Sequence, residues 1–412
     1  MAVTHTKLSV SFNDLSTIFP EEKLFVAQRF RYGYHPVALG QHLKPSPYRV
    51  VRKLGHAASG TVWLSECVVI RHGSRTSFVA VKILSTYYTK KISPGWCHEP
   101  TVLQTIRKYR DHPGYPYVLH LRRIFNTQSE IGDHICFATD VLGSSILDLR
   151  RKQPQFVFSL PIAKRIVKQT LLALQLLHNC GFVHNDIKTN NIMSVLPGGT
   201  LVKDIRTYIG NHPPETYEPL NLPRLTPQPI ITVKSQPLPD IGLLPDLSNL
   251  NIKLIDYGEA QHANAQHMDE SQPAVFSPPE SILGFSWSTP SDIWAVGCMA
   301  FELAGDYHLF RQDDDFNEAV HIQKIVERIG KIPSTFLVDC RWGSSYFDRD
   351  GELKKVRDWD DCSIERAVQG VSEARKLDLT GLDEFLRACV IWDPRRRPTA
   401  AQLLAHPWLK GV

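Results

Sequence analysis

A short polar stretch near the middle of the chain carries side chains suited to phosphoryl transfer. Residues 184–191 read His-Asn-Asp-Ile-Lys-Thr-Asn-Asn and follow directly after a run with helical periodicity. The Asp186 carboxylate can accept or orient the proton of an attacking hydroxyl, the Lys188 ammonium can steady a phosphate, and the Asn191 amide can ligate a metal ion. The alternative is a chance polar loop, which this spacing and context disfavour. We therefore predict Asp186 and Lys188 as catalytic residues and Asn191 as a metal ligand.

A second metal ligand is predicted farther along the chain. Asp256 follows the apolar strand expected at 252–255 and precedes Tyr257 and Gly258. An Asp-x-Gly sequence alone is a common turn, so its weight comes from the preceding strand and from its place after residues 184–191. A carboxylate there would bind the magnesium ion that bridges the phosphates of ATP. We therefore expect ATP and Mg²⁺ as cofactors.

A glycine-containing loop between two predicted strands is the candidate cradle for phosphates. Residues 54–62 read Leu-Gly-His-Ala-Ala-Ser-Gly-Thr-Val. Glycine lets the backbone approach a phosphate closely, although Ala57 replaces the middle glycine of the G-x-G-x-x-G pattern. An ordinary hairpin is the alternative. The ATP-binding residues predicted in this stretch are Leu54, Gly55, Gly60 and Val62.

A lysine at the end of an apolar strand supplies the positive charge that a nucleotide site needs. Lys82 follows Val-Ala-Val at 79–81, and a solvated strand-end lysine is the common alternative. In a kinase, this lysine contacts phosphates and pairs with a helix glutamate, for which Glu99 is the candidate. Pro100 beside it is tolerated only in the first turn of a helix, so either the helix begins near Glu99 or the lysine is paired differently. Ala80, Lys82 and Glu99 are assigned to the ATP site.

The elements that must position these residues change in type along the chain. Short β-branched segments near 48–54, 61–64, 76–84 and 135–141 predict antiparallel strands. From Pro161 to Gly181, apolar residues recur at three- and four-residue spacings, which indicates an amphipathic helix. Further helices are expected at 292–303, 318–329, 381–391 and 399–405. Strands first and helices afterwards indicate an α+β fold with a β-rich lobe and a helical lobe.

Residues 194–250 interrupt this pattern. They contain ten of the 28 prolines, and proline removes a backbone donor and fixes φ. Long helices or central strands are therefore improbable there, and we expect an extended, partly disordered insertion. The predicted organisation is an N-terminal arm at 1–30, an N-lobe at 31–142, and a C-lobe at 143–412 that contains the insertion.

Together the motifs resemble those of eukaryotic protein kinases over roughly residues 48 to 410. Residues 184–191 resemble H-R-D-L-x-x-x-N, Asp256 begins a counterpart of D-F-G, and residues 277–280 resemble A-P-E. The resemblance implies a bilobal fold and ATP-dependent phosphorylation of a protein. It also implies that Glu280 pairs with Arg397 and that the helix from Asp292 anchors the catalytic loop.

Several phrases are similar to one kinase family, the SR-protein kinases, including their shorter fungal members. They include Gly-Tyr-His-Pro-Val at 33–37, Thr-Val-Trp-Leu at 61–64, Asp-Val-Leu-Gly at 140–143 and His-Pro-Trp-Leu at 406–409. The resemblance places the hinge at 140–143, with Thr139 as the gatekeeper. It adds three residues to the predicted ATP site, namely Thr139, Asp140 and Leu142.

The same resemblance implies a substrate class. It points to serine/threonine phosphorylation of Arg/Ser-rich proteins such as splicing factors, and hence to regulation of mRNA splicing. An Arg-rich substrate would need an acidic surface, for which Asp313–Asp315 and Glu318 are candidates. A solvated acidic turn is the alternative reading of these residues.

Asn185 stands where H-R-D has the arginine that grips an activation-loop phosphate in many kinases. We therefore predict a constitutively competent enzyme that needs no such phosphorylation. The alternative class is a pseudokinase that acts as a binding scaffold with weak or no phosphotransfer. A scaffold needs no complete catalytic set, so the presence of five candidate residues disfavours it: Lys82, Asp186, Lys188, Asn191 and Asp256.

Composition narrows the remaining function classes. The 412 residues carry a formal net charge of +5 with no long Lys/Arg run, which argues against a dedicated nucleic-acid binder. Eight cysteines form no C-x-x-C pair, so no zinc or redox motif is indicated. No apolar stretch of about 18 residues is present, and the N-terminus has no apolar signal core. We expect a monomer without membrane or direct nucleic-acid contacts, located in the cytoplasm and nucleus.

Overall fold

The computed structural model describes residues 19–22, 24, 33–69, 75–92, 98–198, 202–221, 227–265, 276–305, 307–311, 316–356, 359–360 and 362–412. The chain divides into two compact units. The first comprises Met1–Leu103, Leu119–Ser144 and Val195–Leu243, and the second comprises Gln104–Val118, Ser145–Ser194 and Leu244–Val412. Most of the predicted arm, residues 1–18, 23 and 25–30, lies outside the described residues.

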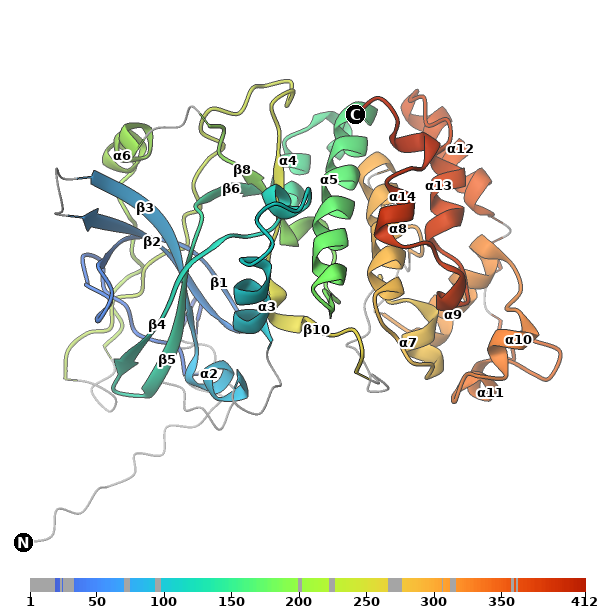
Figure 1. The fold of residues 1–412 in the computed structure, drawn as a ribbon, viewed down its shortest axis with the longest axis horizontal. Coiled ribbons are helices and arrows are strands. Elements are labelled where there is room, and N and C mark those ends of the chain that lie inside the picture. Colours follow the sequence, from blue (N-terminus) through green and yellow to red (C-terminus); the bar gives the residue numbers. More distant parts are fainter. Residues whose placement is uncertain are drawn as a thin grey trace, which may run out of the picture. The chain divides into compact units, whose positions relative to one another are not determined.

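The first unit is built on a five-stranded sheet in the order β1-β2-β3-β5-β4 (Figure 1). Each pair of neighbouring strands in this sheet is antiparallel. The strands are β1 (Tyr48–Ala57), β2 (Gly60–Val69), β3 (Arg75–Leu84), β4 (Leu121–Ser129) and β5 (Gly132–Thr139). Two helices follow β3 in the sequence, α2 (Thr86–Ile92) and α3 (Glu99–Ile106), and the short strand β6 (Leu142–Ser145) follows β5. These strands confirm the hairpins predicted from the β-branched segments.

Alternation along the strands buries apolar side chains on both faces of this sheet. On one face, Trp63 and Val81 belong to a core cluster with Cys136 of β5. On the other face, Leu64 and Phe78 form a second cluster. Since an antiparallel sheet often leaves one face to solvent, the second cluster requires a cover.

The predicted insertion provides that cover, in a way the sequence analysis did not anticipate. It contains the helix α6 (Val202–Asn211), and Ile205 of this helix and Leu238 are buried with Leu64 and Phe78. The sequence made long helices improbable in this segment, and α6 is a short helix of ten residues. The segment was assigned to the helical lobe, whereas Val195–Leu243 belongs to the first unit. The physical reason is burial of apolar side chains that lie between the prolines.

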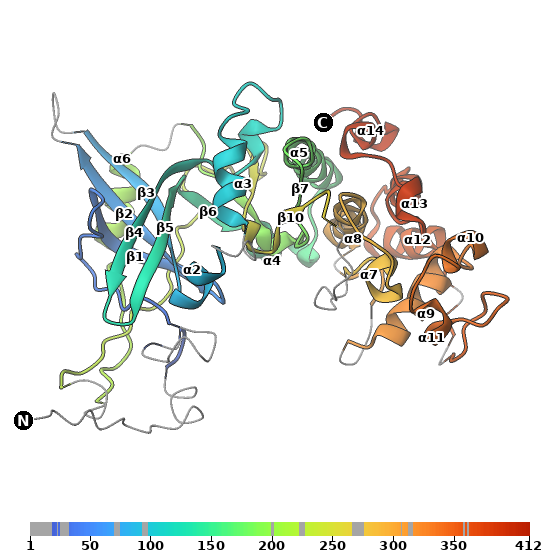
Figure 2. The same ribbon diagram turned by 60° about the horizontal axis from the view of Figure 1, so that its bottom comes forward.

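The second unit is mainly helical (Figures 1 and 2). Its longer helices are α5 (Leu160–Asn179), α8 (Pro290–Gly305), α9 (Glu318–Ile329), α12 (Ile364–Arg375) and α13 (Leu382–Cys389). The shorter ones are α4 (Ile146–Arg151), α7 (Pro279–Leu283), α10 (Ser334–Leu337), α11 (Gly343–Tyr346) and α14 (Ala400–Leu403). Short strands β7 (Phe182–Val183), β8 (Ile192–Val195), β9 (Ile252–Leu254) and β10 (Gln261–His262) lie between them. The strands-then-helices order confirms the predicted α+β class.

Helix α8 is the centre of this unit. Every residue from Ser291 to Gly305 is buried, and α5 and α13 both pack against the helix (Figure 2). A helix that is apolar on all sides must be enclosed by other elements, and this one is. Among the described residues, no helix combines the length and the apolar character needed to cross a bilayer.

A buried ion pair fixes the end of α8 to its neighbours. Arg397 Nη1 lies 2.6 Å from Glu280 Oε1 and Nη2 lies 2.6 Å from Oε2, and neither side chain is exposed to solvent. The Arg397 guanidinium also lies over the ring of Trp294, 4.9 Å from its centre. This pairing confirms the partner that the sequence predicted for Glu280.

Candidate active site

The backbone of residues 184 and 185 is held by one buried carboxylate of α8. Asp292, 1% exposed, accepts hydrogen bonds from the amides of His184 (2.8 Å) and Asn185 (2.9 Å). The imidazole of His178, on α5, lies 2.9 Å from the same carboxylate. A carboxylate that accepts backbone N–H groups in an apolar setting makes a strong, directional anchor. The predicted anchoring role of the helix from Asp292 is therefore confirmed.

Three predicted site residues meet at the Asp186 carboxylate. Lys188 Nζ lies 2.8 Å from Oδ1, and the Asn191 amide nitrogen donates to Oδ2 at 2.6 Å and to the Asp186 carbonyl at 2.9 Å. Asn191 is 6% exposed, whereas the Asp186 side chain is 29% exposed. The Asp186 carboxylate is therefore oriented by its bond from the buried Asn191, and its exposed part remains accessible to a substrate.

Asp256 is brought to the same end of a strand pair as Asn191. Strands β8 and β9 are antiparallel, with Ile192 opposite Leu254, and the amide of Ile255 donates to the Asn191 carbonyl at 2.9 Å. Asp256 follows with φ of 62° and ψ of 74°, in the left-handed region that non-glycine residues seldom adopt. Such strain is typical of functional positions that the surrounding structure holds in place.

The chemistry of this donor set suits a hard divalent cation. Because the Asn191 amide nitrogen is engaged with Asp186, its oxygen is the atom that a cation would use. A carboxylate oxygen from Asp256 would complete an oxygen-only pair, which Mg²⁺ prefers. Asn191 and Asp256 therefore fit the predicted metal roles.

Tyr257, the residue after Asp256, stands where the kinase motif has phenylalanine, and it is fully buried. Tyr257 donates through its hydroxyl to the Leu254 carbonyl at 3.0 Å. The ring of His184 meets it edge-on, with 5.5 Å between ring centres, while His184 Nε2 lies 3.0 Å from the Ile255 carbonyl. The additional hydroxyl is thus satisfied internally, and the turn at Asp256 is packed against the catalytic loop.

In the first unit, Lys82 and Glu99 form an ion pair. Lys82 Nζ lies 2.9 Å from each carboxylate oxygen of Glu99, whose side chain is 2% exposed. Glu99 is the first residue of α3 and Pro100 the second, so the proline falls in the first helical turn, where it costs no hydrogen bond. The structure thus realises the first of the two alternatives left open for Pro100.

The predicted phosphate loop is a tight hairpin between β1 and β2. Ala57 pairs with Gly60, and Gly55 lies opposite Val62, which in turn faces Lys82. A side chain added at Gly55 would meet nothing within 4 Å, so space is open there. At Gly60, an added Cβ would lie 2.1 Å from the Ile83 carbonyl oxygen. Gly60 is therefore required by packing against β3, a structural reason independent of ATP.

The remaining predicted ATP-binding residues lie on or near β3 and β5. Thr139 is buried and stands opposite Ala80, and its hydroxyl lies 3.4 Å from the Ala80 carbonyl. The Asp140 carboxylate lies 3.0 Å from His120 and 3.1 Å from Arg122. Leu54 packs against the cluster that contains Ile205, and Leu142 begins β6.

The predicted residues thus fall into two groups that are each well formed. Lys82, Glu99 and the hairpin belong to the first unit, and the loop with Asp186, together with Asp256, belongs to the second. Of the acidic candidates for substrate docking, Asp313–Asp315 lie outside the described residues. Glu318 accepts a hydrogen bond from the Tyr346 hydroxyl at 2.8 Å.

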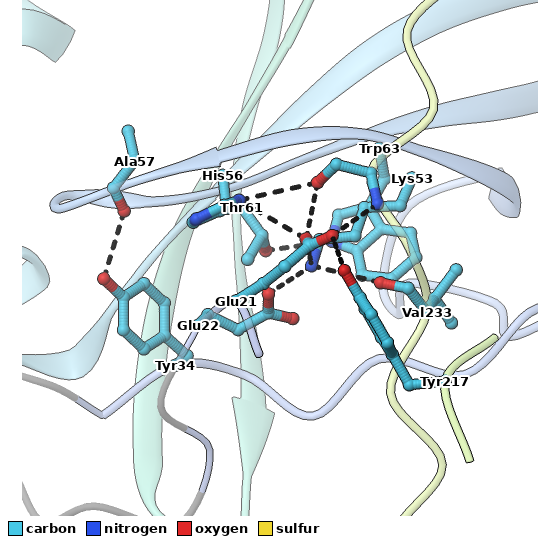
Figure 3. A network of polar contacts seen from close by, with 11 residues as sticks. Glu21, Glu22, Tyr34, Lys53, His56, Ala57, Thr61, Trp63, Tyr217 and Val233 are labelled. Atoms are coloured by element: carbon cyan, nitrogen blue, oxygen red, sulfur yellow. Dashed lines mark hydrogen bonds and ion pairs between the residues drawn. The ribbon is translucent and has the colours of Figure 1, made fainter. Parts of the chain in front are cut away.

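Sequence reasoning missed the residues around the base of the hairpin. Lys53 on β1 is fully buried and contacts Glu21 and Glu22, and Tyr34 contacts the hairpin tip (Figure 3). The signal was weak, because a lysine in a strand is usually solvated and two adjacent glutamates carry no motif. Only the buried position of Lys53 shows that these charges belong together.

Comparison with known proteins gives a consistent result. A model of the protein kinase domain matches residues 48–203 and 242–409. The serine/threonine-protein kinase SRPK of Physarum polycephalum is 30% identical over 97% of this chain and 94% of that protein. SRSF protein kinase 3 of Homo sapiens is 24% identical over 92% of this chain and 88% of that protein. Protein kinase dsk1 of Schizosaccharomyces pombe is 22% identical, with 94% and 85% covered.

Proposed function

Because the chain belongs to the protein kinase family and is a serine/threonine kinase, we propose that it phosphorylates Arg/Ser-rich proteins such as splicing factors, in a constitutively competent state. Two observations support the substrate class. Its relatives include one whose name refers to SRSF proteins and another named SRPK, each covered along most of its length. The chain also carries the SR-protein-kinase-like phrases described above.

The catalytic step assigned to the second unit rests on the Asp186 geometry. Its carboxylate, oriented by Asn191, accepts or aligns the proton of a substrate serine hydroxyl, so that the serine oxygen attacks the terminal phosphorus of ATP. The bond from that phosphorus to the bridging oxygen breaks, and ADP leaves. Lys188, 2.8 Å from the same carboxylate, balances negative charge that develops on the phosphate. The contact between Asn191 and Asp186 is the single observation that carries this assignment.

The first unit supplies the phosphate contacts in this proposal. Lys82, fixed by Glu99, pairs with phosphate oxygens, and the open backbone at Gly55 leaves room for them. In the second unit, Asn191 and Asp256 would hold Mg²⁺, which when bound would neutralise phosphate charge. Thr139 and Leu142 border the adenine.

Constitutive competence is supported by what Asn185 does. The side-chain nitrogen of Asn185, Nδ2, donates to the Glu259 carbonyl at 3.1 Å. This uncharged contact links the catalytic loop to the turn after Asp256. The φ of Asn185 is 66°, a conformation that asparagine tolerates better than most residues. An uncharged residue here needs no phosphate as counter-ion. We also propose that the protein is a monomer and acts in the cytoplasm and nucleus.

The test compares matched peptides with protein that carries no phosphate. Bacterially produced, phosphatase-treated enzyme is assayed with MgATP on an Arg-Ser repeat, a Lys-Ser repeat and a Gln-Ser repeat of equal length. We expect the Arg-Ser repeat to have the highest kcat/KM, about tenfold above Lys-Ser, because only guanidinium binds carboxylates in a bidentate manner. Equal kcat/KM for all three peptides would refute the substrate class, and no turnover before phosphorylation would refute constitutive competence.

A further inference from the structure

Two segments outside the protein kinase domain match meet on strand β1. The match begins at residue 48 and omits residues 204–241. Described residues of the N-terminal segment, Glu21 and Tyr34, and of the insertion, Tyr217 and Val233, surround the end of β1 that leads into the hairpin (Figure 3). All of them belong to the first compact unit.

Tyr34 holds the tip of the hairpin directly. Its hydroxyl lies 3.1 Å from the carbonyl oxygen of Ala57 and 3.2 Å from that of Ala58. A hydroxyl has one proton, so the two carbonyls share it and are kept on the same side of the turn. Ala57 and Ala58 are exposed, whereas Tyr34 is 5% exposed. A buried side chain therefore reaches out to an exposed turn and fixes it.

The position of Tyr34 is itself set by Thr86, the first residue of α2. The amide of Thr86 donates to the Gly33 carbonyl at 2.8 Å. Gly33 has φ of 92°, and an added Cβ would lie 2.0 Å from the Thr86 hydroxyl oxygen. Only glycine fits here, so the segment before Tyr34 packs closely against the start of α2, and this contact fixes Tyr34 beside the hairpin.

Glu21 ties the insertion to the same hairpin. Its carboxylate lies 2.6 Å from Lys53 Nζ and 3.3 Å from His56 Nδ1, both on β1. It also accepts bonds from the amide (2.8 Å) and hydroxyl (2.6 Å) of Ser235 and from the Tyr217 hydroxyl (3.1 Å). Burial raises the pKa of Glu21, but the bonds from Lys53 and Ser235 outweigh it and lower the pKa to about 2. Glu21 is thus ionised at neutral pH.

The ammonium of Lys53 makes this network obligatory. Its side chain is 0% exposed, and Nζ contacts Glu22 as well as Glu21 and lies 3.3 Å from the Val233 carbonyl. A fully buried ammonium requires negative partners, so the segment with Glu21 and Glu22 must be docked for β1 to adopt this position.

We propose that Tyr34 and Glu21 are positioning residues for ATP, which hold the β1–β2 hairpin in the conformation that receives the phosphates. A hairpin ordered before ATP arrives spares the entropy of ordering it on binding. The hairpin of this chain has Ala57, the residue whose carbonyl Tyr34 contacts, where the glycine pattern has its middle glycine. This inference rests on the phosphate-binding role proposed for the hairpin and is independent of the substrate class.

The test measures MgATP binding to the full chain by calorimetry, without peptide, followed by steady-state kinetics. Tyr34→Phe removes only the hydroxyl, and Glu21→Gln removes only the charge. Each is expected to weaken MgATP binding about 3- to 10-fold, the effect of one lost hydrogen bond or ionic contact. The KM for ATP should rise in parallel, while kcat and the KM for peptide stay within about twofold.

Two further variants separate this inference from general instability and from failure of the proposed site. Ser372→Ala loses a similar hydroxyl-to-carbonyl bond, to Leu377 in the second unit, and should bind MgATP like the wild type. Lys82→Ala should abolish most binding. If Lys82→Ala binds normally, the proposed nucleotide site is wrong. If it binds poorly while Tyr34→Phe and Glu21→Gln bind like the wild type, only the positioning roles are overturned.

Amide hydrogen exchange supplies a readout that does not depend on activity. Peptides covering residues 55–62 should exchange faster in Tyr34→Phe and Glu21→Gln, with peptides covering 121–139 unchanged. Unchanged exchange at 55–62 would overturn the inference, because the hairpin would then be held by other contacts.

Discussion

The side-chain amide of Asn191 donates to the carboxylate of Asp186, with 2.6 Å between Nδ2 and Oδ2. This contact does two things at once. It orients the carboxylate that we propose receives the serine hydroxyl, and it leaves the amide oxygen of Asn191 available for the proposed role of metal ligand. The residue predicted to hold the metal therefore also sets the geometry of the residue predicted to act on the substrate.

Replacing this amide by a carboxylate should harm catalysis. In Asn191→Asp, the donor is lost and a second negative charge faces Asp186, which raises the pKa of one member of the pair. We expect kcat to fall at least about tenfold at pH 7.5, with the acidic limb of the kcat–pH profile moved to higher pH. The control is Asn190→Asp, the same change at an exposed neighbour. Equal pH profiles for the two variants would contradict the assignment.

Breaking the Lys82–Glu99 ion pair should raise the KM for ATP. Glu99→Gln keeps the shape of the side chain but removes the negative charge 2.9 Å from Lys82, whose side chain is 14% exposed. The KM for ATP should rise about tenfold, the value of one charge-assisted bond. Glu352→Gln, which breaks the exposed pair with Lys331, is the matched control and should leave KM unchanged. Similar KM values in both variants would show that Glu99 does not fix Lys82 for ATP.

The buried pair between Glu280 and Arg397 should matter for stability. Neither side chain is exposed, so Glu280→Gln leaves a guanidinium without a counter-charge inside the second unit. We expect the free energy of unfolding in urea to fall by about 3–5 kcal/mol. Glu365→Gln removes a partner of Arg387 in a half-exposed pair and should cost less than about 1 kcal/mol. Equal losses would mean that burial does not determine the strength of these pairs.

Stability should decline on mild acidification because of a buried histidine. Burial in α9 lowers the pKa of His321 to about 4, although its contact with the Ser277 carbonyl favours the charged form. The unfolded chain binds the proton near pH 6.5 and the folded protein only near pH 4, so stability is lost as pH falls through this window. His321→Gln should reduce the loss between pH 7 and 5 by roughly 2 kcal/mol. Parallel stability–pH curves for both proteins would contradict this.

The sequence predicted those parts of the fold and site that depend on local pattern. Helix α5 was visible from its apolar periodicity, and the loop with Asp186 was visible from its spacing. The packing of the insertion was not, because prolines on both sides of Ile205 and Leu238 conceal any period. Tertiary burial decides such segments, and it also explains why deletion of residues 205–245 would expose the cluster around Phe78 rather than simply shorten a linker.

The Glu21 network was hidden for a related reason. Its members, Glu21, Lys53 and Ser235, are far apart in the chain, and each alone resembles an ordinary surface residue. Only the folded backbone brings them together. Spacing within one segment reveals a catalytic loop, but contacts between distant segments leave no comparable trace in a single sequence.

The most direct test of the central claim is transfer of the terminal phosphate of ATP to an Arg-Ser repeat peptide by unphosphorylated protein, compared with Asp186→Asn. This substitution keeps an oxygen that can accept the Asn191 amide bond, so fold and ATP affinity should stay near wild type. The account predicts rapid transfer by the wild type and a loss of about 10²- to 10⁴-fold in the variant. Equal rates in the two proteins would contradict it.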